Sequence, residues 1–323
     1  ARTFTPDLQN PNAVKVVSRR TEGSLGGPLP LLFGPIFGVN TINIERSAIA
    51  MVQTGRGDAA IIVLNRYDPR ALDMDSNSRI RVINGGVQVN SSHGEALYMD
   101  SNSEIEADWL SIAGGAELRS NASIDAVDVV EEGSSRISDP LAGLSIPPLG
   151  PDLGSLRVYD DDRETANPGY YSGGILLDSN SRLTLNPGMY ILDGVGLQIL
   201  SNAQLYGQNV TLIIVNNQNS NSAMFVDSNG TVEITPPETG DFAGISIFQS
   251  PSNNNDAFIY SNGNIDISGT SYYPGNRLVL DSNGSEFAFR VIADKVRMYN
   301  DALLIVDYTD GVPIGPSKIF LVE

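Results

Sequence analysis

The stretch MDSNSRIRV, residues 74–82, decides the fold because close copies of it recur along the chain. It returns as MDSNSEIEA at residues 99–107 and as LDSNSRLTL at residues 177–185. In each copy a polar Ser-Asn corner separates two short runs in which every second residue is apolar. Alternation with a period of two predicts β-strands that turn one face toward a core. The copies therefore predict a repeated unit of strand, corner and strand.

Alignment on the Ser-Asn pair extends this pattern to eight copies. The third and fifth residues before the Asn are apolar in all eight, and the last copy slips by one residue to Phe287 after its corner. A small residue follows each Asn. Asn tolerates the left-handed backbone of a sharp corner, and its amide can bond to the equivalent amide of a neighbouring coil. We expect a structural ladder of corner asparagines, which are Asn77, Asn102, Asn121, Asn180, Asn202, Asn229, Asn262 and Asn283.

The spacing of these corners predicts the architecture. Successive asparagines are 25, 19, 59, 22, 27, 33 and 21 residues apart, and most of these steps suit one turn of a solenoid. A unit of this size cannot bury its apolar face alone, so the units stack. We predict an all-β fold, a right-handed parallel β-helix. An antiparallel sandwich or a propeller would need paired hairpin turns or a longer and more even repeat.

The chain is predicted to have two parts. Residues 1–66 lack the repeat, and we expect a small α+β or all-β module there that caps the terminal coil or serves in assembly. Residues 67–323 form the predicted β-helix. The 59-residue step predicts a loop excursion at about residues 127–171, where Pro, Gly and Asp are frequent and alternation is lost.

Composition limits the classes of function and location. A net charge of −18 and a pI near 4.3 argue against binding to nucleic acid or to an anionic membrane. The absence of Cys removes disulfides and thiolate chemistry together. No apolar run is long enough to span a bilayer, and the chain starts at Ala1 without a targeting segment. We expect a secreted or surface-exposed protein whose targeting or membrane segment is absent from this chain.

Acidic residues near the corners raise the alternative of a calcium column, since stacked carboxylates attract Ca²⁺. In sequence order, however, Arg119 stands between Asp100 and Asp178 at the equivalent position and supplies a cation from the protein itself. A second acidic cluster, at residues 160–162, is typical of a solvated surface. We expect no cofactor. The candidate metal ligands, should calcium bind, are Asp75, Asp100, Asp160, Asp161 and Asp162.

Catalytic motifs are sparse. The one histidine, His93, lies in a polar loop sequence, and no motif for a serine nucleophile, a zinc protease, a phosphate or a dinucleotide occurs. Polysaccharide lyases and hydrolases that are β-helices carry acidic residues, some with an Arg, on one outer face. The outward strand positions of this sequence carry no acid pair with an accompanying Arg or Lys. We expect a non-enzymatic protein. The alternative is a β-helix that binds or cleaves carbohydrate, either an adhesin or a polysaccharide lyase or hydrolase.

Several segments resemble one bacterial family. GGILLDSNSRLTLNPGMYILDG at residues 173–194, FAGISIFQS at residues 242–250 and PLPLLFGPIFGVNTINIERSAIA at residues 28–50 look like TadG-like proteins. Those are envelope proteins encoded with tight-adherence (Flp-type) pilus systems. The resemblance implies a β-helical protein associated with such a pilus. The family's N-terminal membrane helix and the von Willebrand domain of some members are not in this sequence.

These observations together predict a structural protein of the bacterial cell surface or extracellular space. We expect it to self-assemble into a filament or sheath, or to associate with a pilus, and to support adhesion. Its expected partners are further copies of itself, bound through the N-terminal module and the end coils, and also pilus or envelope components or glycans. Nucleic acid is not an expected partner.

Overall fold

The computed structural model describes residues 13–51, 59–215, 222–309 and 320–322. The chain divides into two compact units. The smaller one combines residues 1–55 with residues 317–323, and the larger one comprises residues 56–316.

The smaller unit is an antiparallel hairpin joined by a strand from the other end of the chain. β1 (Ala13–Arg20) pairs with β4 (Ile44–Met51), and β4 also pairs with β29 (Phe320–Val322). Between β1 and β4 lie the short pair β2 (Leu29–Pro30) and β3 (Thr41–Ile42) and the 3-10 turn η1 (Gly34–Phe37). No helix in the described ranges is long and apolar enough to cross a bilayer.

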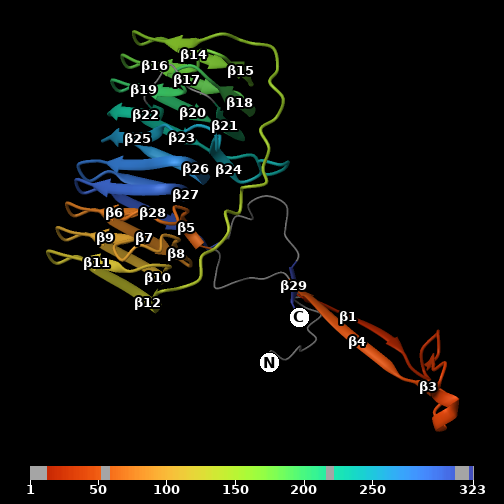
Figure 1. The fold of residues 1–323 in the computed structure, drawn as a ribbon. Coiled ribbons are helices and arrows are strands. Elements are labelled where there is room, and N and C mark those ends of the chain that lie inside the picture. Colours follow the sequence, from red (N-terminus) through yellow and green to blue (C-terminus); the bar gives the residue numbers. More distant parts are fainter. Residues whose placement is uncertain (1–12, 52–58, 216–221, 310–319, 323) are drawn as a thin grey trace. The chain divides into compact units, whose positions relative to one another are not determined.

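The larger unit is a stack of coils in which every strand pairing is parallel (Figure 1). Each coil passes through three ladders of strands. The first ladder holds the strands that precede the corners. In spatial order it runs through β13 (Leu156–Val158), β16 (Ile175–Leu177), β19 (Leu197–Ile199), β22 (Ser222–Ser228), β25 (Asp256–Ser261), the end of β26 (Ile265–Asp281), the end of β27 (Glu286–Tyr299), β6 (Leu72–Met74), β9 (Leu97–Met99) and β11 (Ala116–Leu118).

The other two ladders repeat the same order of coils. The strands after the corners are β14 (Arg163–Ala166), β17 (Arg182–Leu185), β20 (Gln204–Gly207), β23 (Thr231–Ile234), the starts of β26 and β27, β28 (Leu303–Asp307), β7 (Arg79–Ile83), and the starts of β10 (Glu104–Ile112) and β12 (Ser123–Glu132). The third ladder comprises β15 (Gly169–Tyr171), β18 (Gly188–Leu192), β21 (Val210–Ile214), β24 (Ile245–Gln249), the middles of β26 and β27, β5 (Ala59–Val63), β8 (Gly86–Val89), and the ends of β10 and β12.

The core lies inside the coils and is built from the alternate residues that flank the corners. Leu72 and Met74 before the first corner and Ile80 after it are fully buried. Their equivalents in neighbouring coils stack on them to form one continuous apolar cluster. The prediction of an all-β fold with parallel strands is therefore confirmed, whereas the right-handed turn of a β-helix stays a prediction.

The spatial order of the coils differs from their order in sequence. The chain enters the stack at β5 in its middle and runs coil by coil to β12 at one end. It resumes at β13 at the opposite end and returns, so that β27 and β28 pair with β5, β6 and β7. The coils of residues 156–307 therefore lie on one side of β5, and those that follow β7 lie on the other side.

The segment between β12 and β13, residues 133–155, connects the two ends of the stack and is called the strap here. Figure 1 shows it as a yellow-green trace along the coils. Ten coils at a strand spacing of about 4.8 Å require about 43 Å, and an extended segment of this length can reach about 70 Å. The strap is therefore long enough to return the chain past every coil.

The strap also covers an apolar outer face of the third ladder. Leu141 is 2% exposed and belongs to a cluster with Ile213 and Phe248. The Tyr272 hydroxyl donates a hydrogen bond to Asp139 Oδ2 at 2.6 Å. The Asn90 side chain bonds to both the N–H and the carbonyl of Ile137, at 3.0 and 2.9 Å. These contacts fasten the strap to coils that are distant from it in sequence.

Two of the predicted boundaries are corrected by this arrangement. The excursion spans residues 133–155 and not 127–171, because β12 and β13 to β15 are regular strands of the end coils. The stack begins at Ala59, within the range assigned to the N-terminal module, and the C-terminal residues 317–323 belong with that module. A cap on the coil of residues 59–83 is not needed there, since β27 and β28 already bond to its edge.

Cutting the strap tests the join between the two halves of the stack. A protease site inserted between Leu149 and Gly150, which are exposed, should yield two fragments after cleavage that still elute together in native size-exclusion chromatography. The fragments should stay paired because strands of both halves are hydrogen-bonded across the join. Separation of the two fragments without denaturant would contradict the order of coils described above.

Candidate functional site

Five of the eight predicted corners are formed by pairs of residues with left-handed backbone. Ser76 and Asn77 have φ angles of 54° and 58°, and the Asn77 N–H donates to the Ser101 carbonyl of the next coil at 2.8 Å. A left-handed conformation costs an ordinary residue roughly 1–2 kcal/mol, and Asn is one of the few residues that adopts it readily. The same pair of positive φ angles occurs at Ser101–Asn102, Ser120–Asn121, Ser179–Asn180 and Ser201–Asn202.

Neighbouring corner asparagines bond to one another in two separate groups. In each bond the amide nitrogen of one side chain donates to the amide oxygen of another. The four bonds run from Asn102 to Asn77 at 3.0 Å, from Asn121 to Asn102 at 3.3 Å, from Asn202 to Asn180 at 3.1 Å, and from Asn229 to Asn202 at 2.8 Å. Asn262 and Asn283 also meet, through the Asn283 N–H and the Asn262 side-chain oxygen at 3.0 Å. Asn121 and Asn180 are not neighbours, because their coils lie on opposite sides of the join.

Two further corners were missed by reading the sequence for Ser-Asn. Asp160–Asp161 and Asn300–Asp301 have the same paired positive φ angles. The Asp301 N–H donates to the Ser76 carbonyl at 2.8 Å and so links the last coil to the first. The apolar residues that flank the second of these corners would have identified it. Met298 and Leu304 occupy the same buried, inward positions as Met74 and Ile80 at the first Ser-Asn corner.

The proposed metal ligands mostly bond within their own corners. Asp75, Asp100 and Asp178 each accept a hydrogen bond from the N–H of the following serine, at 2.6, 2.7 and 2.7 Å. Bonds from Ser120 and Ser101 lower the pKa of Asp100, since they stabilise its charged form. Among the described residues, no group of three or more His, Asp or Glu could hold a metal ion.

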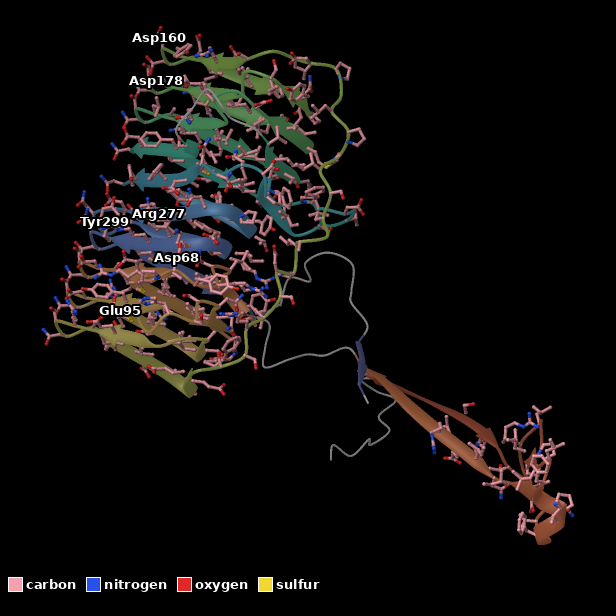
Figure 2. All side chains as sticks on the ribbon, in the orientation of Figure 1. Asp68, Glu95, Asp160, Asp178, Arg277 and Tyr299 are labelled. Carbon is pink, nitrogen blue, oxygen red and sulfur yellow. The ribbon has the colours of Figure 1, made fainter. Side chains whose placement is uncertain are left out.

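The order of this acidic column also needs correction. Asp178 was expected next to Arg119, but its strand pairs with those of Arg157 and Gln198, while β11, which precedes Arg119, is at the far end of the stack. Asp160 to Asp162 form the corner of the end coil, next to the corner of Asp178 (Figure 2). These aspartates serve as turn residues or lie at the solvated end of the stack.

A polar cluster lies where the returning coil meets the first coil. The Asn65 amide donates to Asp68 at 3.3 Å and to both oxygens of Asp294, at 3.3 and 3.1 Å. Lys295 Nζ donates to Asp68 at 2.9 Å. This bond lowers the pKa of Asp68, whereas burial raises the pKa of Asp294. The cluster therefore connects two carboxyl groups of different acidity across the join.

Aromatic side chains line the outer face of the first ladder. Phe225 and Phe258 lie on paired strands with ring centres 6.3 Å apart, and Tyr260 is 5.3 Å from Phe258. All three are half-buried. Tyr299 lies on the same face, where burial raises its pKa. Ion pairs surround this aromatic row, such as Arg277 with Asp256 at 2.7 Å.

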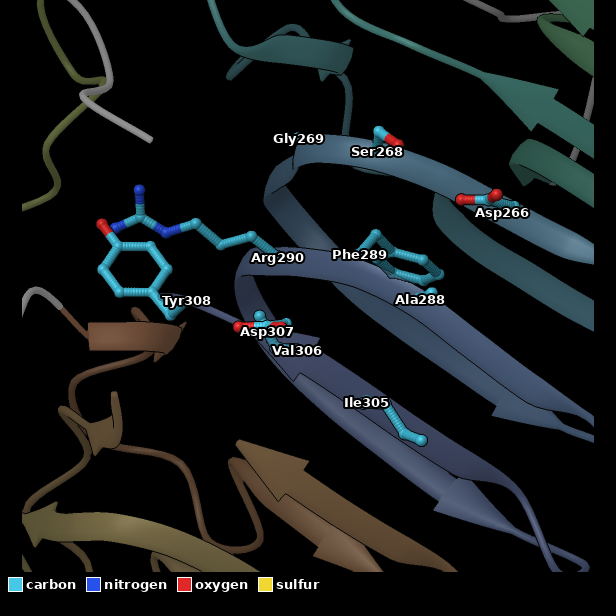
Figure 3. A pocket seen from close by; sticks show the side chains of 10 residues that line it. All are labelled: Asp266, Ser268, Gly269, Ala288, Phe289, Arg290, Ile305, Val306, Asp307 and Tyr308. Carbon is cyan, nitrogen blue, oxygen red and sulfur yellow. The ribbon is translucent and has the colours of Figure 1, made fainter. Parts of the chain in front are cut away.

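A pocket of about 400 Å³ opens where β26, β27 and β28 separate (Figure 3). The register of β26 against β27 shifts at Asp266, which parts the two strands. Arg290 is buried, donates to the Ala59 carbonyl at 3.0 Å, and lies over the Tyr308 ring at 4.8 Å. Asp266 and Asp307 contribute carboxylates to the pocket lining. The pocket thus combines a guanidinium, two acids and an aromatic ring.

The lone histidine is engaged locally. His93 Nδ1 accepts a hydrogen bond from the Glu95 N–H at 3.0 Å, within one loop. This bond stabilises the loop. The described residues thus define a class, an all-β protein with parallel coils.

Comparison with known proteins relates one part of the chain to a family. Residues 1–50 match a family described as putative Tad-like Flp pilus-assembly. This match supports a Tad-related protein, and it ends before β5, where the parallel stack begins. No curated protein and no solved structure matches the chain significantly.

Substitutions at Asn102 test the contribution of the corners to stability. Asn102→Ala removes the side-chain bonds to Asn77 and Asn121 and places Ala at φ 59°, so we expect a loss of about 1–3 kcal/mol in unfolding free energy. Asn102→Gly removes the same bonds but permits the backbone, and it should lose about 1 kcal/mol less. Denaturant titration of the variants gives both values. Equal losses would show that backbone conformation does not matter at this corner.

The pKa of Asp68 predicts a dependence of stability on pH. Because its folded pKa lies below the usual value of about 4, the ionised carboxylate stabilises the fold above that value, and this contribution is lost as the pH falls through the folded pKa. Asp68→Asn should lower the melting temperature slightly at pH 7 and have progressively less effect in acid. Asp241→Asn, at an exposed loop position, is the control. A deficit for Asp68→Asn that is the same at pH 7 and at pH 2 would contradict this reading.

Proposed function

We propose that this chain is a non-enzymatic structural protein of the bacterial cell envelope that associates with a Tad-type pilus system. The observation that carries the proposal is the match of residues 1–50 to Tad-like Flp pilus-assembly proteins. The TadG-like resemblance of segments in the stack is consistent with it. A position at the cell surface or outside the cell belongs to the same proposal.

The stack is suited to a structural role. It buries a continuous apolar core along its length and bonds its backbone in three parallel ladders. We regard it as a right-handed β-helix, since connections between parallel strands of one sheet are right-handed in nearly all proteins. A rod of this kind can hold a binding surface away from an attachment point. The corner asparagines would then be structural residues, which strengthen the edge of each coil.

We also propose that the protein self-assembles. The two end coils of the stack differ in how well they could pair with another copy. At the β13 end, Glu164 occupies a position whose partner in the next coil, Leu183, is buried. An inward charge of this kind opposes pairing with another sheet. At the β12 end, Leu118 is 42% exposed and Ile124 is partly exposed at inward positions. The β12 end is therefore the better candidate for contact with another copy or with a pilus component.

The second candidate function is binding to glycans, by which the protein would support adhesion. The aromatic row of Phe225, Phe258 and Tyr260 favours it, because aromatic rings pack against sugar rings and the nearby Asp and Arg side chains can bond to hydroxyls. The pocket beside Arg290 offers a similar combination of groups. Cleavage of a polysaccharide would additionally require an acid and a base placed on either side of one glycosidic bond.

Deletion of the gene in the source bacterium tests the pilus association. We expect fewer pili by electron microscopy and weaker surface adherence, with both restored by the intact gene. Normal pili and normal adherence in the deletion strain would contradict the proposal.

The finer parts of the proposal need purified protein. Concentrated protein should form polymers in negative-stain images and in sedimentation velocity, and only monomers would be seen if self-assembly is wrong. Incubation with polygalacturonate and alginate should release no new reducing ends. Their release would support the alternative of a carbohydrate-cleaving enzyme.

A further inference from the structure

The hairpin of the smaller unit ends in an apolar tip, defined here as residues 25–42. The wider stretch of residues 23–44 contains no charged residue, although 18% of the whole chain is charged. β2, η1 and β3 lie within the tip. It is carried by β1 and β4, whose pairing ends at Arg20 and Ile44.

The large apolar side chains of the tip face solvent. Leu32, Phe33, Ile36 and Phe37 are 86, 68, 76 and 81% exposed. Leu25 and Val39 are exposed as well. Exposed apolar groups that cluster in this way, and are not scattered singly, mark a site of contact with another protein, a ligand or a membrane.

The shape of the tip is specified by its sequence. Gly34 has no room for a side chain, because a Cβ would lie 1.9 Å from the Val39 carbonyl oxygen. Gly38 ends η1 with a φ of 76°, which favours glycine. The N–H groups of Leu31 and Val39 bond to the Asn40 and Gly34 carbonyls at 3.0 Å. Several backbone polar groups are thus paired within the tip, while its large apolar side chains are exposed.

The composition of the tip favours a lipid surface over a protein partner. Residues that dominate the binding energy of protein interfaces are enriched in Trp, Tyr and Arg, whereas the exposed large side chains here are mainly Leu, Ile and Val, with two Phe. Below the tip, Arg19, Arg20 and Arg46 are exposed on the paired strands. They outnumber the neighbouring acids Glu22 and Glu45 and can contact lipid phosphates.

The negative net charge of the whole chain does not apply to the smaller unit. The smaller unit has six basic residues, Arg2, Lys15, Arg19, Arg20, Arg46 and Lys318, and four acidic ones, Asp7, Glu22, Glu45 and Glu323. The whole negative charge of the chain therefore belongs to the stack. Negative charge therefore opposes contact of the stack with an anionic membrane, whereas the smaller unit that carries the tip is slightly positive.

We propose that the apolar tip inserts into the interface of a phospholipid bilayer, with the arginines below it in contact with anionic headgroups. The tip is too short to span a bilayer, so it enters only the boundary between headgroups and acyl chains, to a depth of about 5–10 Å. This proposal is independent of the pilus association, and each can fail without the other.

Vesicle flotation of the full chain tests the proposal. Vesicles of phosphatidylcholine and phosphatidylglycerol should bind the chain, and vesicles of phosphatidylcholine alone should bind it more weakly because the arginines lose their partners. The double variant Phe33→Asp and Phe37→Asp should reduce binding by at least about tenfold. Val127→Asp replaces an apolar residue of the stack that is 80% exposed, and it should bind as the original chain does.

A fluorescent variant keeps the test decisive if the double variant misfolds. Phe37→Trp adds an indole at the tip, while the one native tryptophan, Trp109, is buried in the stack. Its emission should shift to shorter wavelength on vesicles and be quenched by brominated lipid. An absent shift, or equal vesicle binding by the double variant and the original chain, would overturn the proposal. Tip-dependent dimers without lipid would also overturn it, in favour of a second copy as the occupant.

Discussion

The structure depends on the backbone hydrogen bonds that join its last coil to its first. β27 and β28 pair in parallel with β5, β6 and β7, and these strands belong to segments more than 200 residues apart. Without this join, residues 59–132 and 156–309 would form two short stacks, each with an additional open end. Side chains reinforce it, since Asn65 bonds to Asp294 and Arg290 bonds to the Ala59 carbonyl. One continuous core follows from this pairing.

The join also determines how the chain is divided between its units. Because the stack is entered at Ala59 and left near Thr309 on adjoining coils, both chain ends are available to the smaller unit, where β29 completes the sheet with β1 and β4. The join also requires the strap, because the chain must return from the β12 end of the stack to the β13 end before the last coil can reach the first. Its buried Leu141 and its bond from Tyr272 make it part of the packed structure.

The two units also differ in the charge and polarity of their surfaces. The stack carries the negative charge, the aromatic row and the pocket beside Arg290, whereas the smaller unit carries the apolar tip and a small positive charge. In the proposed pilus-associated protein these surfaces would have separate uses. Average composition describes mainly the larger unit, because the smaller unit contributes few of the charged residues.

Local patterns were readable from the sequence because they depend on neighbouring residues. Alternation around Met74 and Ile80 predicts strands with one buried face, and Ser-Asn predicts a left-handed corner. Asp160–Asp161 and Asn300–Asp301 were missed because Asp and Asn can satisfy the same backbone requirement without the Ser-Asn letters. The cluster around Asn65 and Asp294 was not predictable, since its members share no pattern and meet only across the join.

The sequence by itself determined most of the strands, eight of the corners with their inward residues, and the absence of charge from the tip. Only the tertiary structure decided which coils are neighbours, where the strap lies and that the tip residues remain exposed. The physical reason is that parallel backbone pairing is nearly the same between any two coils, so a repeat specifies register within a ladder but not the order of its strands. That order follows from the length of the strap and from packing between distant segments.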